Sequence, residues 1–234
     1  MLSDIGWVDG ITASGVVLSG CIVGLFIIYK ARKLEANLLF YLGLLGILAG
    51  LAFLGVFLDF LWVIFTERNM PNTYGMVGLL SYIWIAPLIV LAIHIGAELM
   101  IHKKKWYITS VYLVLMAIFE ILLFLNPMGS FNFDEPEKSG EALIDYNLIL
   151  TSPAGFLMII FIVSIVIFLG FGFLIKAIQS TGALRKKFLL LTIGVFMYAI
   201  FGLLESLMEP GYLLIIIRIG YISGPLFMYL GLKG

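Results

Sequence analysis

Apolar residues run along the chain in seven long stretches, and polar and charged residues gather in the short segments between them. The stretches cover residues 7–29, 38–65, 76–101, 106–125, 153–178, 188–208 and 212–230. Each is long enough to cross a hydrocarbon core, which takes about 20 helical residues. Continuous runs favour helices over a β-barrel, whose strands would be short and alternating. We therefore predict an all-α integral membrane protein with seven transmembrane helices in one domain, residues 1–234.

Composition supports the same class of protein. Hydrophobic residues make up 62% of the chain and charged residues only 12%, and the mean hydropathy is +1.14. A soluble domain needs more polar residues to cover the surface that faces water. The lipid bilayer is therefore the first expected partner, and a multi-pass position in the plasma membrane is the expected location.

The basic residues predict an orientation. Alternate connections share a high content of lysine and arginine: Lys30, Arg32, Lys33, Lys103, Lys104, Lys105, Lys176, Arg185, Lys186, Lys187 and, near the end of the chain, Lys233. The other connections contain only Arg68 and Lys138. Because positively charged short loops stay in the cytoplasm, the N-terminus is expected outside and the C-terminus in the cytoplasm.

The longest connection, residues 126–152, is expected on the outer side and is acidic. Its acids are Asp134, Glu135, Glu137, Glu141 and Asp145, against one lysine. One interpretation is the avoidance of positive charge on an exposed, solvated loop. The other is a lid or a cation-attracting vestibule, since the loop is long and Phe131, Phe133 and Tyr146 can anchor it.

Sliding the chain over itself by 146 residues indicates an internal repeat. Apart from leucine matches, the shift aligns Gly24 with Gly170, Lys30-Ala31 with Lys176-Ala177, and Asp59 with Glu205, and a shorter loop then aligns Pro87 with Pro225. The matches predict a parallel 3+1+3 repeat made of residues 7–101, a linker helix at 106–125, the outer loop 126–152, and residues 153–232. Each proline removes a helical hydrogen bond and predicts a kink or hinge, although kinks also occur in rigid bundles.

Four ionisable residues are expected in the outer third of the membrane: Asp59, Glu120, Glu205 and Arg218. Such groups are costly in lipid, so each is a hypothesis for a functional site. Glu205 and Arg218 flank a tight turn at similar depth, and a structural ion pair is expected between them. The remaining acids, Asp59 and Glu120, are then expected to be protonated, to reach water or to bind a cation or amine, or else to snorkel to the outer interface. We place the functional prediction on Asp59, the acid without an expected partner.

His94 and Glu98 are four residues apart and therefore share one face of the third helix. Hydrogen bonding of His94 to Glu98 or to a neighbouring helix is the first interpretation, and a proton relay is the second. His94 and His102 are the only histidines and Cys21 is the only cysteine. A zinc site of the usual His and Cys type therefore has too few ligands, and neither a metal nor a cofactor is expected.

The sequence contains no arrangement typical of an enzyme. It lacks a nucleophile paired with a base, a histidine-rich metal site, a Gly-rich phosphate loop and a dinucleotide fingerprint. The basic clusters at residues 103–105 and 185–187 are interpreted as topology signals near anionic headgroups, not as a nucleic-acid surface. We predict that the protein is not an enzyme and has no nucleic-acid partner.

Three segments carry a resemblance to a known group of proteins: Arg185-Lys-Lys, Gly202-Leu-Leu-Glu-Ser206 and the Leu230-Gly-Leu-Lys ending. They are similar to stand-alone seven-helix proteins of prokaryotes, archaea included, that resemble the membrane sensor region of histidine kinases. The 3+1+3 plan also resembles the SWEET-type sugar transporters, whose characteristic prolines lie in the first two helices of each repeat. The last helix has Arg218 and no lysine, unlike retinal proteins, and the chain shares only topology with G-protein-coupled receptors.

Two functional hypotheses follow, from different classes. In the first, the chain is a binding or sensory module that takes a small cationic or lipidic ligand in an outward-facing acidic pocket. Because no kinase domain follows the last helix, such a sensor is expected to signal through a membrane partner protein. In the second, it is a small transporter or channel with alternating access between two three-helix repeats. A non-catalytic structural subunit of a membrane complex is the third possibility.

Overall fold

The computed structural model describes residues 2–208 and 210–232, so that Met1, Glu209, Lys233 and Gly234 lie outside the description. Its long helices are α1 (Asp4–Lys33), α2 (Asn37–Leu51), α3 (Leu54–Thr66), α4 (Met76–Tyr82), α5 (Ile85–Met100), α6 (Lys105–Leu125), α8 (Pro153–Ile165), α9 (Phe171–Gln179), α10 (Gly182–Glu205) and α11 (Leu213–Leu232). By length and hydropathy, six helical segments of the described chain can cross a membrane, or seven with the bent pair α2 and α3. The predicted class, a multi-span helical membrane protein, is confirmed.

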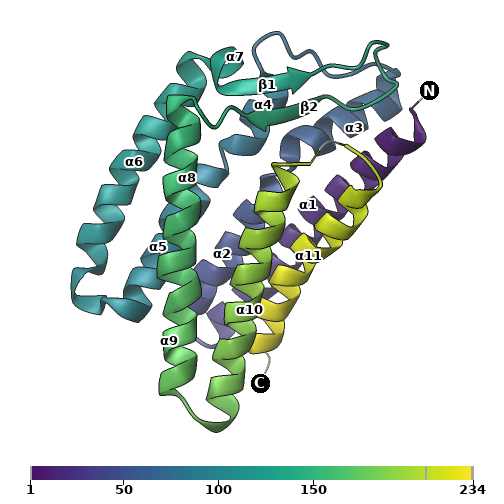
Figure 1. Ribbon diagram of the computed structural model, residues 1–234. Helices are drawn as coiled ribbons and strands as arrows, with labels where there is room; N and C mark the ends of the chain where they lie inside the picture. The colour runs from purple at the N-terminus through teal and green to yellow at the C-terminus, as the bar shows by residue number, and fades with distance from the viewer. Residues whose placement is uncertain (1, 209, 233–234) are drawn as a thin grey trace.

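One end of the bundle is covered by structure that the hydropathy pattern did not predict. A short helix, α7 (Pro127–Ser130), leads into an antiparallel hairpin of β1 (Phe131–Asp134) and β2 (Asp145–Leu148). Figure 1 shows this hairpin lying across the helix ends, on the same side as the N-terminus and opposite the C-terminus. We call this side the hairpin end. The opposite end holds a single turn of 3₁₀-helix, η1 (His102–Lys104).

The aromatic residues predicted as anchors do hold the hairpin to the bundle. Phe131 is buried and packs edge-on against Tyr82, with ring centroids 4.9 Å apart. The Tyr146 hydroxyl donates a hydrogen bond to Ser81 Oγ at 2.5 Å. Phe133 packs against Phe131 at 5.7 Å. Phe131 and Tyr146 thus contact α4 directly, and Phe133 packs beside Phe131 within the hairpin.

The second apolar stretch, expected as one span over 38–65, is two helices that meet at an angle of 47°. The break lies at Ala52 and Phe53. Just beyond it, the backbone N–H of Gly55 donates to Ser81 Oγ at 2.8 Å, so a side chain from α4 takes the place of a helical carbonyl. A hydroxyl inserted into the ladder is a recognised cause of a sharp bend. Neither proline nor periodicity marks this bend in the sequence.

The predicted kink at Pro87 is displaced. Pro87 lies in the first turn of α5, where the missing N–H costs little, and the chain breaks before it, at Ile83 and Trp84. Pro225 lies inside α11, which continues through it. The fifth span is also irregular, because a five-residue π-helix, η2 (Val166–Gly170), separates α8 from α9. Such π-segments are frequent at functional sites.

Glycines let two helix pairs approach closely. A Cβ built on Gly20 of α1 would lie 2.7 Å from the Cα of Gly50 in α2. A Cβ on Gly194 of α10 would lie 2.7 Å from the carbonyl oxygen of Gly224 in α11. Helices without a hydrophobic driving force between them associate through such small-residue contacts. The pairs α1 with α2 and α10 with α11 also make the most extensive helix–helix contacts among the described residues.

Candidate ligand-binding site

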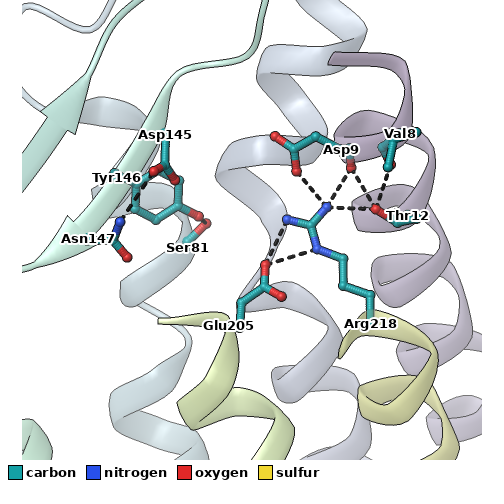
Figure 2. Close-up of polar contacts among 9 residues, drawn as sticks. All are labelled: Val8, Asp9, Thr12, Ser81, Asp145, Tyr146, Asn147, Glu205 and Arg218. Carbon is teal, nitrogen blue, oxygen red and sulfur yellow. Dashed lines mark hydrogen bonds and ion pairs between the residues drawn. The ribbon is translucent and has the colours of Figure 1, made fainter. Parts of the chain in front are cut away.

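Arg218 is the centre of a buried ionic cluster near the hairpin end. It is only 3% exposed. Its Nη2 and Nε donate to Glu205 Oε1 at 2.7 and 2.9 Å, and its Nη1 lies 2.6 Å from Asp9 Oδ1. The same Nη1 donates to Thr12 Oγ1 at 2.8 Å and to the Asp9 carbonyl oxygen at 2.6 Å. Figure 2 shows the guanidinium held between Asp9 and Glu205. The ion pair expected between Glu205 and Arg218 is present.

Asp9 was missed at the sequence level. It stands close to the start of α1, where an acid resembles an ordinary interfacial residue, yet it is only 5% exposed. A signal was available, since Asp9 and Thr12 are three residues apart and therefore share a face of a helix whose other buried residues are small or apolar. A polar stripe on one face of a spanning helix indicates a buried polar partner.

A cavity of about 280 Å³ begins at this cluster and extends into the bundle. Its polar end is formed by Asp9, Asp145, Tyr146, Glu205 and Arg218. The rest of its wall is apolar and comes from α2, α5, α8, η2, α10 and α11: Leu45, Leu88, Ile89, Ala92, Met158, Ile165, Leu169, Val195 and Met228. The cavity therefore has a charged head region and a larger hydrophobic body.

The polar end has more acidic groups than basic ones. Three carboxylates, those of Asp9, Asp145 and Glu205, line it together with the single guanidinium of Arg218. The five hydrogen-bond and ion-pair contacts of that guanidinium already involve Asp9, Thr12 and Glu205. Glu205 Oε2 is buried and accepts no hydrogen bond from the described residues. The site therefore offers a free carboxylate oxygen to a ligand, while the donors of Arg218 are already engaged.

Asp145 approaches the cluster from the hairpin. It is paired directly across the two strands with Asp134, an arrangement in which like charges repel. Partial burial, followed by the negative charges of Asp9, Asp134 and Glu205, raises the pKa of Asp145 to about 6. The carboxylate is thus ionised at neutral pH in surroundings that favour a nearby positive charge. Figure 2 shows Asp145 and Tyr146 on the strand side of the site, facing the helices that carry Asp9 and Glu205.

A second cavity, of about 290 Å³, lies on the hairpin side of the same wall. Its lining includes Asp9 and Asp145, which it shares with the first cavity, and the loop acids Asp134 and Glu135. Four acids, Asp9, Asp134, Glu135 and Asp145, therefore line this space beside the loop of residues 126–152, and we call it the acidic vestibule. Asp9 and Asp145 line both cavities and therefore lie at the boundary between them.

Asp59, on which the functional prediction was placed, does not line either cavity. It is fully buried in α3 and accepts three hydrogen bonds: from the Met70 amide at 2.7 Å, the Ile144 amide at 2.9 Å and Asn69 Nδ2 at 3.0 Å. Asn69 in turn donates to the Ala142 carbonyl at 2.8 Å. Asp59 therefore connects the loop after α3 to the loop between the strands, and both of its oxygens are occupied.

The other predicted residues lie apart from the cavity. Glu120 is on α6, with both carboxylate oxygens buried and without a hydrogen-bond partner in the described chain. The His94 ring shares a hydrogen bond with Thr109 on the neighbouring helix α6 at 3.0 Å, so the expected bond to a neighbouring helix is present and the bond to Glu98 is absent. The proton relay stays a prediction. Glu98 instead contacts His102 at 2.8 Å and Lys105 at 2.6 Å.

Within residues 2–208 and 210–232, no group of three or more His, Cys, Asp or Glu side chains is placed to hold a metal ion. Comparisons of the chain with protein-family models, with curated proteins and with solved structures found no match. The residues that line the two cavities are therefore the basis of the function proposed below.

Proposed function

We propose that this protein is a membrane-embedded binding or sensory module for an amphipathic ligand with a cationic head and a single apolar chain. The observation that carries the proposal is the two-part cavity, in which an acidic head region continues into a hydrophobic body. A molecule whose polarity matches both parts satisfies the acceptors at one end and fills apolar space at the other.

The size of the cavity supports a single chain. Pockets for small molecules in proteins usually measure about 300 to 1,000 Å³, so a cavity of about 280 Å³ is at the lower limit. Two acyl chains would need considerably more space. A single alkyl chain beneath a compact ammonium group is the better match.

The charge balance favours a cation over an anion. An anionic head would have to displace Asp9 or Glu205 from Arg218 and leave a buried carboxylate without its partner, which is strongly destabilising. An ammonium group instead donates to Glu205 Oε2 and lies close to Asp145, and so it relieves the repulsion among the acids. A primary or secondary amine is therefore the expected head.

Orientation and repeat remain parts of this proposal. The basic connections support an N-terminus outside, which would place the head region near the outer leaflet and the vestibule in extracellular water. A parallel 3+1+3 repeat is supported by the sequence matches alone, since the two helix pairs with the most extensive contacts, α1 with α2 and α10 with α11, are not equivalent in such a repeat. Signalling would pass to a membrane partner protein.

A transporter is the second candidate, because one specific observation favours it. The vestibule and the membrane cavity share Asp9 and Asp145, so a cation that passes these two residues moves from one space to the other. Release of bound amine into the lumen of a vesicle, dependent on the protein, would favour transport over binding alone.

The proposal is tested with amphiphiles that share one chain and differ in the head. Competition against labelled dodecylamine, on protein reconstituted in lipid nanodiscs, is expected to give saturable binding for dodecylamine. Dodecanol and laurate are expected to bind at least tenfold more weakly. Glu205→Gln is expected to lower the amine affinity about tenfold, which corresponds to about 1.4 kcal/mol. The matched control is Glu137→Gln, which removes an exposed loop acid. Equal affinities for the three heads would contradict the proposal.

A further inference from the structure

We infer that the ligand's apolar chain enters the cavity sideways from the bilayer, through an opening between α8 and the half of α10 near the hairpin. This inference rests on the proposed function and adds the route of entry, which the site alone does not define. A single-chain amphiphile dissolves in the membrane far more readily than in water, because burial of each CH₂ group contributes about 0.8 kcal/mol. Its natural source is therefore the lipid phase.

The opening is marked by side chains that belong to the cavity wall and to the outer surface at the same time. Ile159 of α8 and Leu203 of α10 both line the cavity, yet they are 43% and 45% exposed. Leu150, just before α8, lines it as well and is 47% exposed. These residues therefore lie at the margin of the cavity, where its wall meets the outer surface, and this is where we place the opening. All three are apolar, as an entrance for a hydrocarbon chain requires.

The packing of the two helices explains the opening. Near the end opposite the hairpin, α10 packs against α9 and η2. Toward the hairpin end, α8 contacts α5 and α6, while α10 contacts α11. Figure 1 shows α8 and α10 close together at the α9 side and diverging toward the hairpin. The π-helix η2, which still contacts α10, lies at the end of α8 from which the two helices diverge.

The charged residues near the opening agree with this route. Glu205, the last residue of α10, and Ser206 just after it line the same cavity as Leu203, so the polar head region lies next to the apolar entrance. A chain that enters between Ile159 and Leu203 would bring its ammonium group to Glu205 with little reorientation. The acidic vestibule, by contrast, is lined by Asp134, Glu135 and Asp145, and its charges do not favour an apolar chain.

Bulky substitutions at the opening provide the test. Ile159→Trp and Leu203→Trp are each expected to slow association of vesicle-delivered dodecylamine at least tenfold in stopped-flow measurements. They are expected to slow dissociation as well, because a narrowed passage affects entry and exit alike. Matched controls are Val163→Trp on α8 and Ile200→Trp on α10, which are 51% and 54% exposed and lie outside the cavity. Both controls are expected to keep the original rates.

The possible outcomes separate this inference from the proposed function. Unchanged rates for both Ile159→Trp and Leu203→Trp, with saturable binding intact, would overturn the lateral route and leave the binding site in place. Slower association in Glu135→Trp alone would place the entrance at the vestibule and would also overturn it. Absence of saturable dodecylamine binding in the unsubstituted protein would remove the proposed function itself. Ile159 and Leu203 are both exposed and lie on two different helices. If one of the two variants fails to fold, the other still tests the lateral route.

Discussion

Asp59 and Glu205 occupy matching places when the chain is shifted by 146 residues, but the folded protein treats them differently. Asp59 has no exposed surface and accepts hydrogen bonds from two backbone amides and one side-chain amide. Glu205 is ion-paired through one oxygen, while its second oxygen is buried without a partner and the side chain lines a cavity. The first carboxylate connects loops, and the second is available to a ligand.

The difference shows which property distinguishes a structural acid from a binding acid. Both lie in apolar helices, and both would be costly there without compensation. Both oxygens of Asp59 accept hydrogen bonds from the loops that fold over it, so neither is free to bind a ligand. Arg218 pairs with one oxygen of Glu205, and the other oxygen has no hydrogen-bond donor among the described residues. Incomplete pairing beside a cavity, and not burial alone, is what marks a candidate site.

The largest effect is expected from removing the cation that compensates Glu205. Arg218→Met leaves Asp9 and Glu205 buried and unpaired, which is expected to lower the free energy of unfolding by about 3 to 5 kcal/mol. Thermal or denaturant unfolding in detergent measures the loss. The triple variant Asp9→Asn, Glu205→Gln, Arg218→Met removes all three charges and is expected to recover most of the stability. A triple variant no more stable than Arg218→Met would show that the charges are not the cause.

A somewhat smaller effect is expected at the other acid. Asp59→Ala leaves three N–H donors without their charged acceptor and is expected to cost about 3 kcal/mol of stability, at about 1 kcal/mol or more per lost bond. Because those donors come from the loop after α3 and from the loop that precedes β2, the hairpin should also become sensitive to protease.

The matched control for Asp59 is Asp134→Ala, an exposed acid on the hairpin that is expected to change stability little. Protease resistance of the hairpin in Asp59→Ala equal to that of the unsubstituted protein would contradict the structural role. At temperatures where Asp59→Ala is folded, the variant is expected to bind dodecylamine saturably. Glu205→Gln, by contrast, is expected to bind the amine more weakly.

The smallest effect is expected from protonation of Asp145. Its pKa of about 6 means that the carboxylate is ionised above that pH and neutral below it. A cationic ligand favours the ionised form, so dodecylamine affinity is expected to rise as the pH increases through 6. The expected rise from pH 5 to pH 7 is about tenfold, equivalent to about 1.4 kcal/mol for one charge. Equilibrium binding at a series of pH values measures it.

Two variants identify the residue responsible for that pH dependence. Asp145→Asn is expected to give a flat profile at the lower affinity. Asp134→Asn removes a negative charge across the strands, which lowers the pKa of Asp145 and should move the midpoint to lower pH. The groups that face Asp145 are Asp9, Asp134, Glu205 and the cation Arg218. A pH profile unchanged in Asp145→Asn would assign the dependence to one of the others.

Much of the fold follows from hydropathy, because a bilayer admits only segments whose backbone groups are satisfied internally. The apolar stretches predicted the spanning helices closely, and the nearness of Glu205 to Arg218 followed from two helices joined by a tight turn. The bend at Ala52 could not be predicted in the same way, since it depends on Ser81, which is distant in sequence and inserts its hydroxyl beside Gly55. A helix bend that is caused by a side chain from another segment does not change the hydropathy pattern of the bent helix itself.

The sequence by itself determined that the chain is a helical membrane protein, and it identified Glu205 and Arg218 as a pair, because both conclusions depend on local composition and short separations. Only the tertiary structure decided which other residues join them. Asp9 and Asp145 reach the cluster from the first helix and from the hairpin, and Asp59 is removed from consideration by amides that arrive from two loops. The physical reason is that a buried carboxylate is defined by its partners, and those partners are distant in the chain.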